Sequence, residues 1–265
     1  MDTPLVSVIL ATYNGSRYIR EAISSVLAQK YDNFELIIID DASTDSTAHI
    51  IAEYVEKDSR VRSIKNDKNL KLVESLNRGI SFSKWEYIAR IDDDDRWSDT
   101  GKLMKQIQEF EKNPNLAVVG TQGYVIDENG TQTGQEMVHA LHSIDVRREF
   151  RVKNALIHTS ILAKKRAFVG AWLYKKDWLY VEDFDLWLRV LGKGYDVANI
   201  SDFSIEYRMR SGSTTGKKYH HMQWLTFCRL FIEKFSYGNH DIKYYFLFIR
   251  LVLVIVPERI IRYLK

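Results

Sequence analysis

The fold is indicated most clearly by residues 87–95, which read Tyr-Ile-Ala-Arg-Ile-Asp-Asp-Asp-Asp. The first five are apolar or aromatic except for Arg90, and a short run of this kind is typical of a buried strand. Four consecutive aspartates follow directly. Because like charges a few ångströms apart repel each other, a fully ionised row of this kind needs a cation beside it. The stretch therefore predicts a buried strand that ends in an acidic edge.

On both sides of this stretch, predicted strands and helices alternate. Short apolar runs predict strands at residues 5–11, 34–39 and 61–64. Apolar side chains at helical spacing predict helices over residues 19–27, 50–55, 72–80 and 103–110. This alternation implies right-handed crossovers and a mostly parallel sheet with helices on both faces. We therefore predict an α/β, Rossmann-like fold.

The second half of the chain has a more mixed pattern. Residues 116–126 predict a strand, and residues 145–152 and 182–191 predict helices. The sequence shows no internal repeat and no low-complexity linker between this half and the first. We expect the second half to join the same sheet.

Acidic residues follow two of the predicted strands, at residues 40–41 and 92–95. Sheets of this kind bind ligands outside the carboxyl ends of their strands. Because side chains alternate along a strand, Asp92 and Asp94 can point to one side, as paired oxygen ligands for Mg²⁺ or Mn²⁺. Asp41 can accept hydrogen bonds from a base or a ribose. A solvated acidic turn and an acidic helix start are the alternatives.

Composition and missing motifs narrow the class of protein. Of the 265 residues, 45% are hydrophobic, so the chain can bury enough apolar surface to fold. A single cysteine, Cys228, forms no internal disulfide and fits a reducing cytosol. No Gly-x-Gly-x-x-Gly follows the first strand and no Walker lysine loop occurs, which argues against dinucleotide oxidoreductases and P-loop hydrolases.

Several motifs, taken in order, resemble those of family 2 glycosyltransferases. They are the first strand with Tyr13-Asn14, then Ser25 and Gln29, residues 40–45, residues 89–95, residues 182–189, and Tyr207-Arg208 with Ser211 and Ser213. Each motif alone is weak, but the ordered set over about residues 5–213 is specific. The resemblance implies a GT-A fold that binds a nucleotide sugar.

The resemblance also implies roles for individual residues. Those implied to contact the nucleotide sugar are Ala11, Tyr13, Asp41, Arg90, Asp92 and Asp93. Asp94 is implied to ligate the divalent cation, Mg²⁺ or Mn²⁺, and Asp183 to act as the general base. One base for the acceptor hydroxyl and one cation for the departing diphosphate suffice for inversion at the anomeric carbon. From the residues alone, the acids at 182–185 also fit a charged helix start with an Asp185–Arg189 ion pair.

In the organisation that the resemblance implies, residues 1–216 form the glycosyltransferase domain, with a nucleotide-binding half at 1–100 and an acceptor half at 101–216. The function implied is inverting transfer of one sugar from a nucleotide-sugar donor to a glycan or lipid-linked acceptor in surface polysaccharide biosynthesis. The Gln-x-x-Arg-Trp signature of processive members is absent, which favours single transfer. A sugar-phosphate nucleotidylyltransferase and a non-catalytic nucleotide-sugar-binding protein are the alternatives.

Three positions depart from the pattern of this family. Residues 69–71 read Asn-Leu-Lys where members often have Asn-x-Gly, so a glycine is lost and a cation gained. Arg210 stands where many members have histidine, and Asp99 stands where a proline is usual. His158, in an apolar run, fits either an acceptor pocket or the core.

Residues 217–265 form a basic segment, with nine Lys or Arg against three acids. Within it, residues 244–256 are apolar or aromatic except for Arg250, too short for a membrane span, which needs about 20 apolar residues. The pattern favours a helix held at the membrane surface by anionic lipid, and a buried helix or a dimer contact is the alternative. We expect a cytoplasmic protein, peripheral on the inner face of the cytoplasmic membrane, with no nucleic-acid partner.

Overall fold

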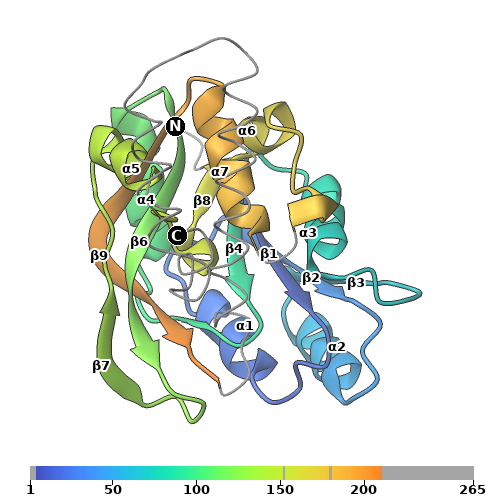
Figure 1. Cartoon of the computed structure of the whole chain (residues 1–265). Helices are drawn as coiled ribbons and strands as arrows, with labels where there is room; N and C mark the ends of the chain where they lie inside the picture. The colour runs from blue at the N-terminus through green and yellow to red at the C-terminus, as the bar shows by residue number, and fades with distance from the viewer. Residues whose placement is uncertain (1–3, 152, 179–180, 211–265) are drawn as a thin grey trace, which may run out of the picture. The chain divides into compact units, whose positions relative to one another are not determined.

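Strands and helices alternate through the first half of the chain in a computed structural model of the protein, which describes residues 4–151, 153–178 and 181–210 (Figure 1). In chain order the elements are β1 (Val6–Thr12), α1 (Ile19–Leu27), β2 (Phe34–Asp40), α2 (Thr47–Lys57), β3 (Val61–Lys65), α3 (Leu72–Phe82) and β4 (Tyr87–Asp92). The alternation predicted from the apolar runs is confirmed, because β1, β2 and β4 are buried on both faces and so consist largely of apolar residues.

These four strands form a parallel sheet in the order β3-β2-β1-β4. The register pairs Ala11 of β1 with Asp92 of β4, and Thr12 with Asp40 of β2. The acids that end β2 and β4 therefore flank the end of β1 at one edge of the sheet. This is the edge at which parallel α/β sheets bind ligands.

Helices cover both faces of this parallel region, as predicted. Val8 and Leu10 of β1 belong to a core cluster with Ile23 of α1 and Ile50 of α2. The alternate side chains face α3, where a Cβ on Gly79 would lie 2.6 Å from Ile39 and 2.7 Å from Ile9. Glycine at this position lets the helix lie directly against the sheet.

The second half extends the same sheet and adds helices around it. Its elements are β5 (Arg96–Trp97), α4 (Lys102–Lys112), β6 (Leu116–Ile126), β7 (Gln132–Met137), α5 (Ser143–Glu149), β8 (Leu162–Lys164), α6 (Lys165–Gly170), α7 (Glu182–Gly192), β9 (Asp196–Arg208) and the short 3₁₀ turns η1 (His158–Ser160) and η2 (Lys176–Trp178). Beyond β4 the strand order is β8-β6-β9-β5, with β7 paired to β6. Figure 1 shows β6, β7 and β9 as long neighbouring strands.

Pairing directions differ between the two halves. β8 is antiparallel to both β4 and β6, whereas β9 is parallel to β6. The sheet is therefore parallel from β3 to β4 and mixed beyond it. The helix expected over residues 145–152 is found at Ser143–Glu149, and the helix expected over 182–191 is α7.

The predicted C-terminal segment, residues 217–265, lies outside the described residues, so its membrane contact stays a prediction. In the part of the chain that the structure describes, no helix has both the length and the apolar character needed to cross a bilayer.

Candidate active site

The first acid of the row, Asp92, ends β4 and is held by an arginine of the same strand. Arg90 donates from both terminal nitrogens to the two carboxylate oxygens, at 2.8 and 2.6 Å. Arg90 is only 3% exposed. A buried, bidentate guanidinium fixes the orientation of Asp92.

The second acid, Asp93, turns toward the end of β1. Thr12 donates from Oγ1 to Asp93 Oδ2 at 2.5 Å. A Cβ on Gly15 would lie 2.3 Å from the same carboxylate oxygen, so glycine is required there for the loop after β1 to pass so close. Burial, and then the nearby charge of Asp94, raise the pKa of Asp93 to about 7.

Two arginines from the end of β9 meet the remaining acids. Nη2 of Arg210 lies 2.7 Å from Asp94 Oδ2, and Nε of Arg208 donates to the Asp94 backbone carbonyl oxygen at 2.7 Å. The backbone N–H of Arg208 donates to Asp95 Oδ1 at 2.8 Å. Burial, followed by the charge of Asp92, raises the pKa of Asp94. Burial, followed by the charge of Asp94, raises the pKa of Asp95 well above its ordinary value.

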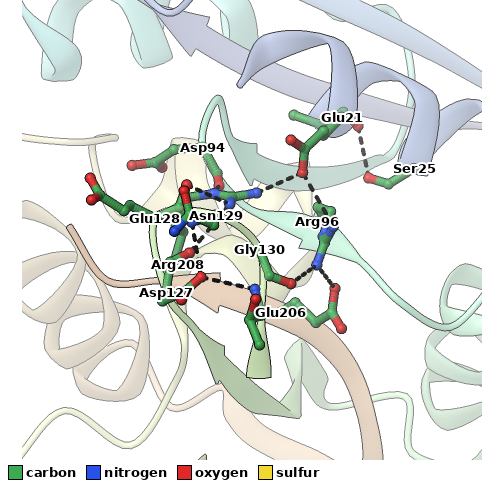
Figure 2. Close-up of polar contacts among 12 residues, drawn as sticks. Glu21, Ser25, Asp94, Arg96, Asp127, Glu128, Asn129, Gly130, Glu206 and Arg208 are labelled. Atoms are coloured by element: carbon green, nitrogen blue, oxygen red, sulfur yellow. Dashed lines mark hydrogen bonds and ion pairs between the residues drawn. The ribbon is translucent and has the colours of Figure 1, made fainter. Parts of the chain in front are cut away.

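Arg208 connects this row to the rest of the molecule (Figure 2). Its side chain is fully buried, and its Nη2 donates to Glu21 Oε2 of α1 at 2.7 Å. Glu21 also accepts from Arg96 at 3.2 Å. Arg96 in turn donates to the backbone oxygen of Gly130 at 2.9 Å and pairs with Glu206 at 2.7 Å. The network joins α1, the segment after the acids, the β6–β7 turn and β9.

Ser25 and Gln29, singled out in the sequence as motif residues, hold the chain just after the acids. The backbone N–H of Trp97 donates to Ser25 Oγ at 3.0 Å. Gln29 donates to the Asp99 carbonyl oxygen at 2.7 Å and accepts from the N–H of Leu103 at 3.2 Å. These contacts explain why both positions belong to the motif without contributing charge to the site.

Asp41 orders the loop that precedes α3. Its oxygens accept from Asn66 Nδ2 at 2.6 Å, from the N–H of Leu70 at 2.7 Å and from the N–H of Lys71 at 2.8 Å. Lys71 has φ +74°, a left-handed conformation that favours glycine. The family glycine therefore corresponds to a real backbone requirement, which Lys71 meets with strain. The predicted contact of Asp41 with a base stays a prediction.

A second pair of acids begins α7. Asp183 is buried, and its Oδ2 accepts from Asn154 Nδ2 at 2.6 Å. Burial raises the pKa of Asp183, against the hydrogen bonds from the Phe184 N–H and from Asn154. Burial, and next the charge of Asp183, raise the pKa of Glu182 to about 7. Asn154 is a site residue that the motif comparison missed, because a lone amide in an apolar run has no motif of its own.

The pair of Arg90 and Asp92 lies within electrostatic reach of both acid groups. The positive charge of Arg90 lowers the pKa of Glu182 and of Asp183. The negative charge of Asp92 raises the pKa of Glu182 and also that of Asp94. The structure thus brings the β4 edge and the start of α7 into one charged region. Of the two predicted residues at the end of β1, Ala11 is paired with Asp92, and Tyr13 is 48% exposed.

His158 and Asp185 are both held by neighbouring side chains. His158 Nε2 lies 2.7 Å from the hydroxyl of Tyr174, and burial, followed by the charge of Arg90, lowers the pKa of His158 well below its usual value. Its ring also packs edge-on against Trp187, and the residue as a whole is half-buried. Asp185 and Arg189 form the predicted ion pair at 2.6 Å, with Asp185 buried.

The carboxylate oxygens at this edge of the sheet suit a hard divalent cation only in part. Aspartate oxygens are ligands that Mg²⁺ and Mn²⁺ accept, and burial, followed by the charge of Asp92, raises the pKa of Asp94. Among the described residues, however, no three acids, histidines or cysteines are grouped closely enough to hold a metal ion. Asp94 therefore fits such an ion if water and phosphate oxygens supply the remaining ligands.

The protein is thus an α/β protein with acids at the carboxyl edge of a parallel sheet and a second acid pair at a helix start, and the carboxyl edge is where such sheets bind ligands. The family model described as glycosyl transferase family 2 matches residues 7–171. The chain belongs to this family, and the resemblance stated from the sequence is confirmed.

Several curated relatives are similar over most of the chain. EpsE of Bacillus subtilis, a putative glycosyltransferase, is 35% identical over 218 residues, which cover 81% of this chain and 76% of EpsE. WfaP of Escherichia coli is 32% identical over 215 residues, which cover 81% of both chains. WfaP is described as a UDP-Glc:alpha-D-GlcNAc-diphosphoundecaprenol beta-1,3-glucosyltransferase.

Solved structures share the fold. A fragment of TarS from S. aureus in complex with UDP-GlcNAc matches with a TM-score of 0.66 at 18% identity, over 84% of this chain and 65% of that chain. The mannosyltransferase PcManGT from Pyrobaculum calidifontis, in complex with GDP-Man and Mn²⁺, matches with a TM-score of 0.63 at 17% identity, over 90% and 66%. The chain thus spans just under two thirds of these structures, and the predicted GT-A fold is confirmed.

Proposed function

We propose that this family 2 glycosyltransferase transfers a single sugar from a nucleotide-sugar donor to an acceptor hydroxyl, with inversion at the anomeric carbon. The observation that supports this most is the buried ion pair of Arg90 and Asp92 at the end of β4, because Arg90 acts on the charges of Glu182 and Asp183 and Asp92 acts on that of Asp94. A donor site and a base on different elements, within one charged region, are what a single displacement requires.

The donor side consists of the residues at the carboxyl edge of the sheet. Ala11, Tyr13 and Asp41 would border the nucleotide, and Arg90, Asp92 and Asp93 would lie near the ribose and sugar. Asp94 would hold Mg²⁺ or Mn²⁺, and the ion when bound neutralises the charge that develops on the departing diphosphate. Arg90 keeps the Asp92 carboxylate in a fixed orientation throughout, since the pair is bidentate and buried.

Asp183 would be the general base. The hydrogen bond from Asn154 fixes one of its oxygens, and its burial raises its pKa and so its proton affinity. The carboxylate takes the proton of the acceptor hydroxyl as that oxygen forms its bond to the anomeric carbon. The bond to the diphosphate oxygen breaks on the opposite face. No acid is needed at the leaving group if a cation neutralises it.

The acceptor would be a glycan or a lipid-linked saccharide used in surface polysaccharide biosynthesis. The relative WfaP, whose name gives a diphosphoundecaprenol-linked acceptor, supports this class. Such an acceptor would place the enzyme at the inner face of the cytoplasmic membrane, in contact through residues 217–265. The domain halves at 1–100 and 101–216 would then hold donor and acceptor respectively.

A panel of nucleotide sugars tests this function. The purified protein is incubated with each donor, Mn²⁺ and a membrane lipid extract, and the released products are separated. Transferred sugar together with free nucleoside diphosphate supports the proposal. Release of pyrophosphate would indicate a nucleotidylyltransferase instead, and binding of a donor without turnover would indicate a nucleotide-sugar-binding protein.

A further inference from the structure

The two arginines at the end of β9 contact Asp94 in different ways. Arg208 donates to its backbone carbonyl oxygen, whereas Nη2 of Arg210 lies 2.7 Å from its carboxylate oxygen. Both guanidinium groups lie over the ring of Tyr18, at 4.4 and 5.7 Å from its centroid. The structure thus places a permanent cation at the carboxylate that the proposed mechanism gives to a divalent ion.

The two arginines also differ in their freedom to move. The side chain of Arg208 is fully buried and donates to Glu21 and to backbone oxygens of the β6–β7 turn. The side chain of Arg210 is 44% exposed. Arg208 is therefore fixed by its contacts. The guanidinium of Arg210 is already partly in solvent, so it can move away from Asp94 without first leaving a buried position.

A guanidinium and a metal ion cannot share this carboxylate easily. Arginine has no lone pair with which to ligate a metal, so Arg210 cannot join the ion's coordination shell. A divalent cation on Asp94 would also repel the nearby positive charge. Phosphate oxygens, in contrast, are the groups that the planar fork of a guanidinium binds best.

We propose that the guanidinium of Arg210 competes with the divalent ion for the carboxylate of Asp94. When the ion binds, the Arg210 side chain moves and pairs with the donor's diphosphate. In the donor-free protein it neutralises Asp94, which weakens binding of the metal alone. With donor present it pairs with phosphate oxygens, which makes nucleotide binding less dependent on metal. The identity of the phosphate-bearing ligand rests on the proposed function, but the competition for Asp94 does not.

Binding of Mn²⁺ alone tests the competition without any nucleotide. Free Mn²⁺ is titrated by electron paramagnetic resonance with the wild type, Arg210→Ala and Arg210→Lys. We expect Arg210→Ala to bind Mn²⁺ about fivefold more tightly, the factor that corresponds to an ion pair at the upper end of the exposed range. Arg210→Lys keeps the charge and should bind Mn²⁺ like the wild type.

The matched control is Arg148→Ala. Arg148 forms an ion pair of 2.8 Å with Asp145 on α5, and both side chains are exposed. Its removal should leave Mn²⁺ affinity unchanged. Thermal melts of all variants check that each is folded. A Mn²⁺ affinity of Arg210→Ala equal to or weaker than that of the wild type overturns the proposal.

Binding of UDP by calorimetry, with EDTA or with saturating Mn²⁺, tests the transfer to phosphate. Arg210→Ala should lose about tenfold in UDP affinity in EDTA, the effect of one charge-assisted contact, and less in Mn²⁺. Equal losses in both conditions overturn this second step. If the wild type binds neither UDP nor GDP, the donor class in the proposed function is wrong, while the Mn²⁺ result still decides the competition.

Discussion

The two acid groups of the site are organised in opposite ways. Asp92 and Asp94, after β4, each contact a guanidinium, from Arg90 and Arg210. Asp183, at the start of α7, accepts instead from the neutral amide of Asn154. The charge of Arg210 opposes the rise that burial causes in the pKa of Asp94, whereas the buried Asp183 is held by a neutral amide and can take up a proton. The difference suits the first group to an ion and a diphosphate, and the second to proton transfer.

Replacing Asp183 by asparagine tests the proton-transfer side of this comparison and should have the largest effect. We expect transfer to fall about a thousandfold, because the proton acceptor is lost, while donor binding remains. Initial rates and UDP calorimetry measure the two quantities. The control is Asp185→Asn on the same turn, which should lower the melting temperature through loss of the Arg189 pair but keep transfer at a temperature where it is folded. Near-normal turnover in Asp183→Asn would remove the base assignment.

Replacing Asp94 by alanine tests the ion-binding side. Donor affinity in Mn²⁺ should fall on the order of a hundredfold, because the cation that neutralises the diphosphate loses its ligand. The matched control is Asp145→Ala, which removes an exposed aspartate from an ion pair of similar length. If Asp94→Ala binds the donor as tightly as this control in Mn²⁺, the two acid groups do not divide their roles as proposed.

Replacing Asn154 by alanine tests what the neutral amide does for Asp183, because the proposed base itself stays in place. The amide stabilises the charged form of Asp183 and so lowers its pKa. Without it the pKa rises further, and a base that must be deprotonated loses activity first at low pH. We expect about a tenfold loss of kcat, with the acidic limb of the kcat/KM profile moved to higher pH. A loss without any shift of the profile would make Asn154 purely structural.

The smallest effect is expected on stability, from Asp93→Asn. Burial raises the pKa of Asp93 to about 7 in the folded protein, against an ordinary value of 3.8. Between these values the folded chain keeps a proton that the unfolded chain has lost, so this group makes stability fall as the pH rises from about 4 to about 7. In EDTA, the melting temperature of Asp93→Asn relative to that of the wild type should rise as the pH increases over this range. Parallel curves would contradict the buried, protonated state.

The sequence predicts the alternating elements of the first half and, in the second half, β6, α5 and α7, but it misses β7, β8 and β9 for a physical reason. Strands β1, β2 and β4 are buried on both faces, so each is a short apolar run, and only the outer strand β3 is mostly exposed. In contrast, β8 has three residues, and β7 is exposed and polar. β9 is long but pairs with β6 through shifts in register. Local periodicity does not reveal strands that are stabilised by distant partners.

The site shows the same division between features that the sequence predicts and features that only the structure reveals. The acids could be found as motifs because each group is contiguous in the chain. The contacts of these acids could not be predicted, since Asn154 lies 29 residues before Asp183 and the backbone of Arg208 reaches Asp95 across 113 residues. The strained conformation of Lys71 also becomes visible only in the backbone angles. Sequence patterns therefore located the acids, and the structure shows what surrounds them.

The stereochemistry of the product tests the central claim most directly. A donor found in the nucleotide-sugar panel is used to glycosylate an acceptor, and proton NMR assigns the anomeric configuration of the transferred sugar before it can equilibrate. A single base on α7, opposite a cation-held diphosphate at the sheet edge, predicts a configuration opposite to that of the donor. A product with the donor's configuration would contradict this arrangement of the two acid groups.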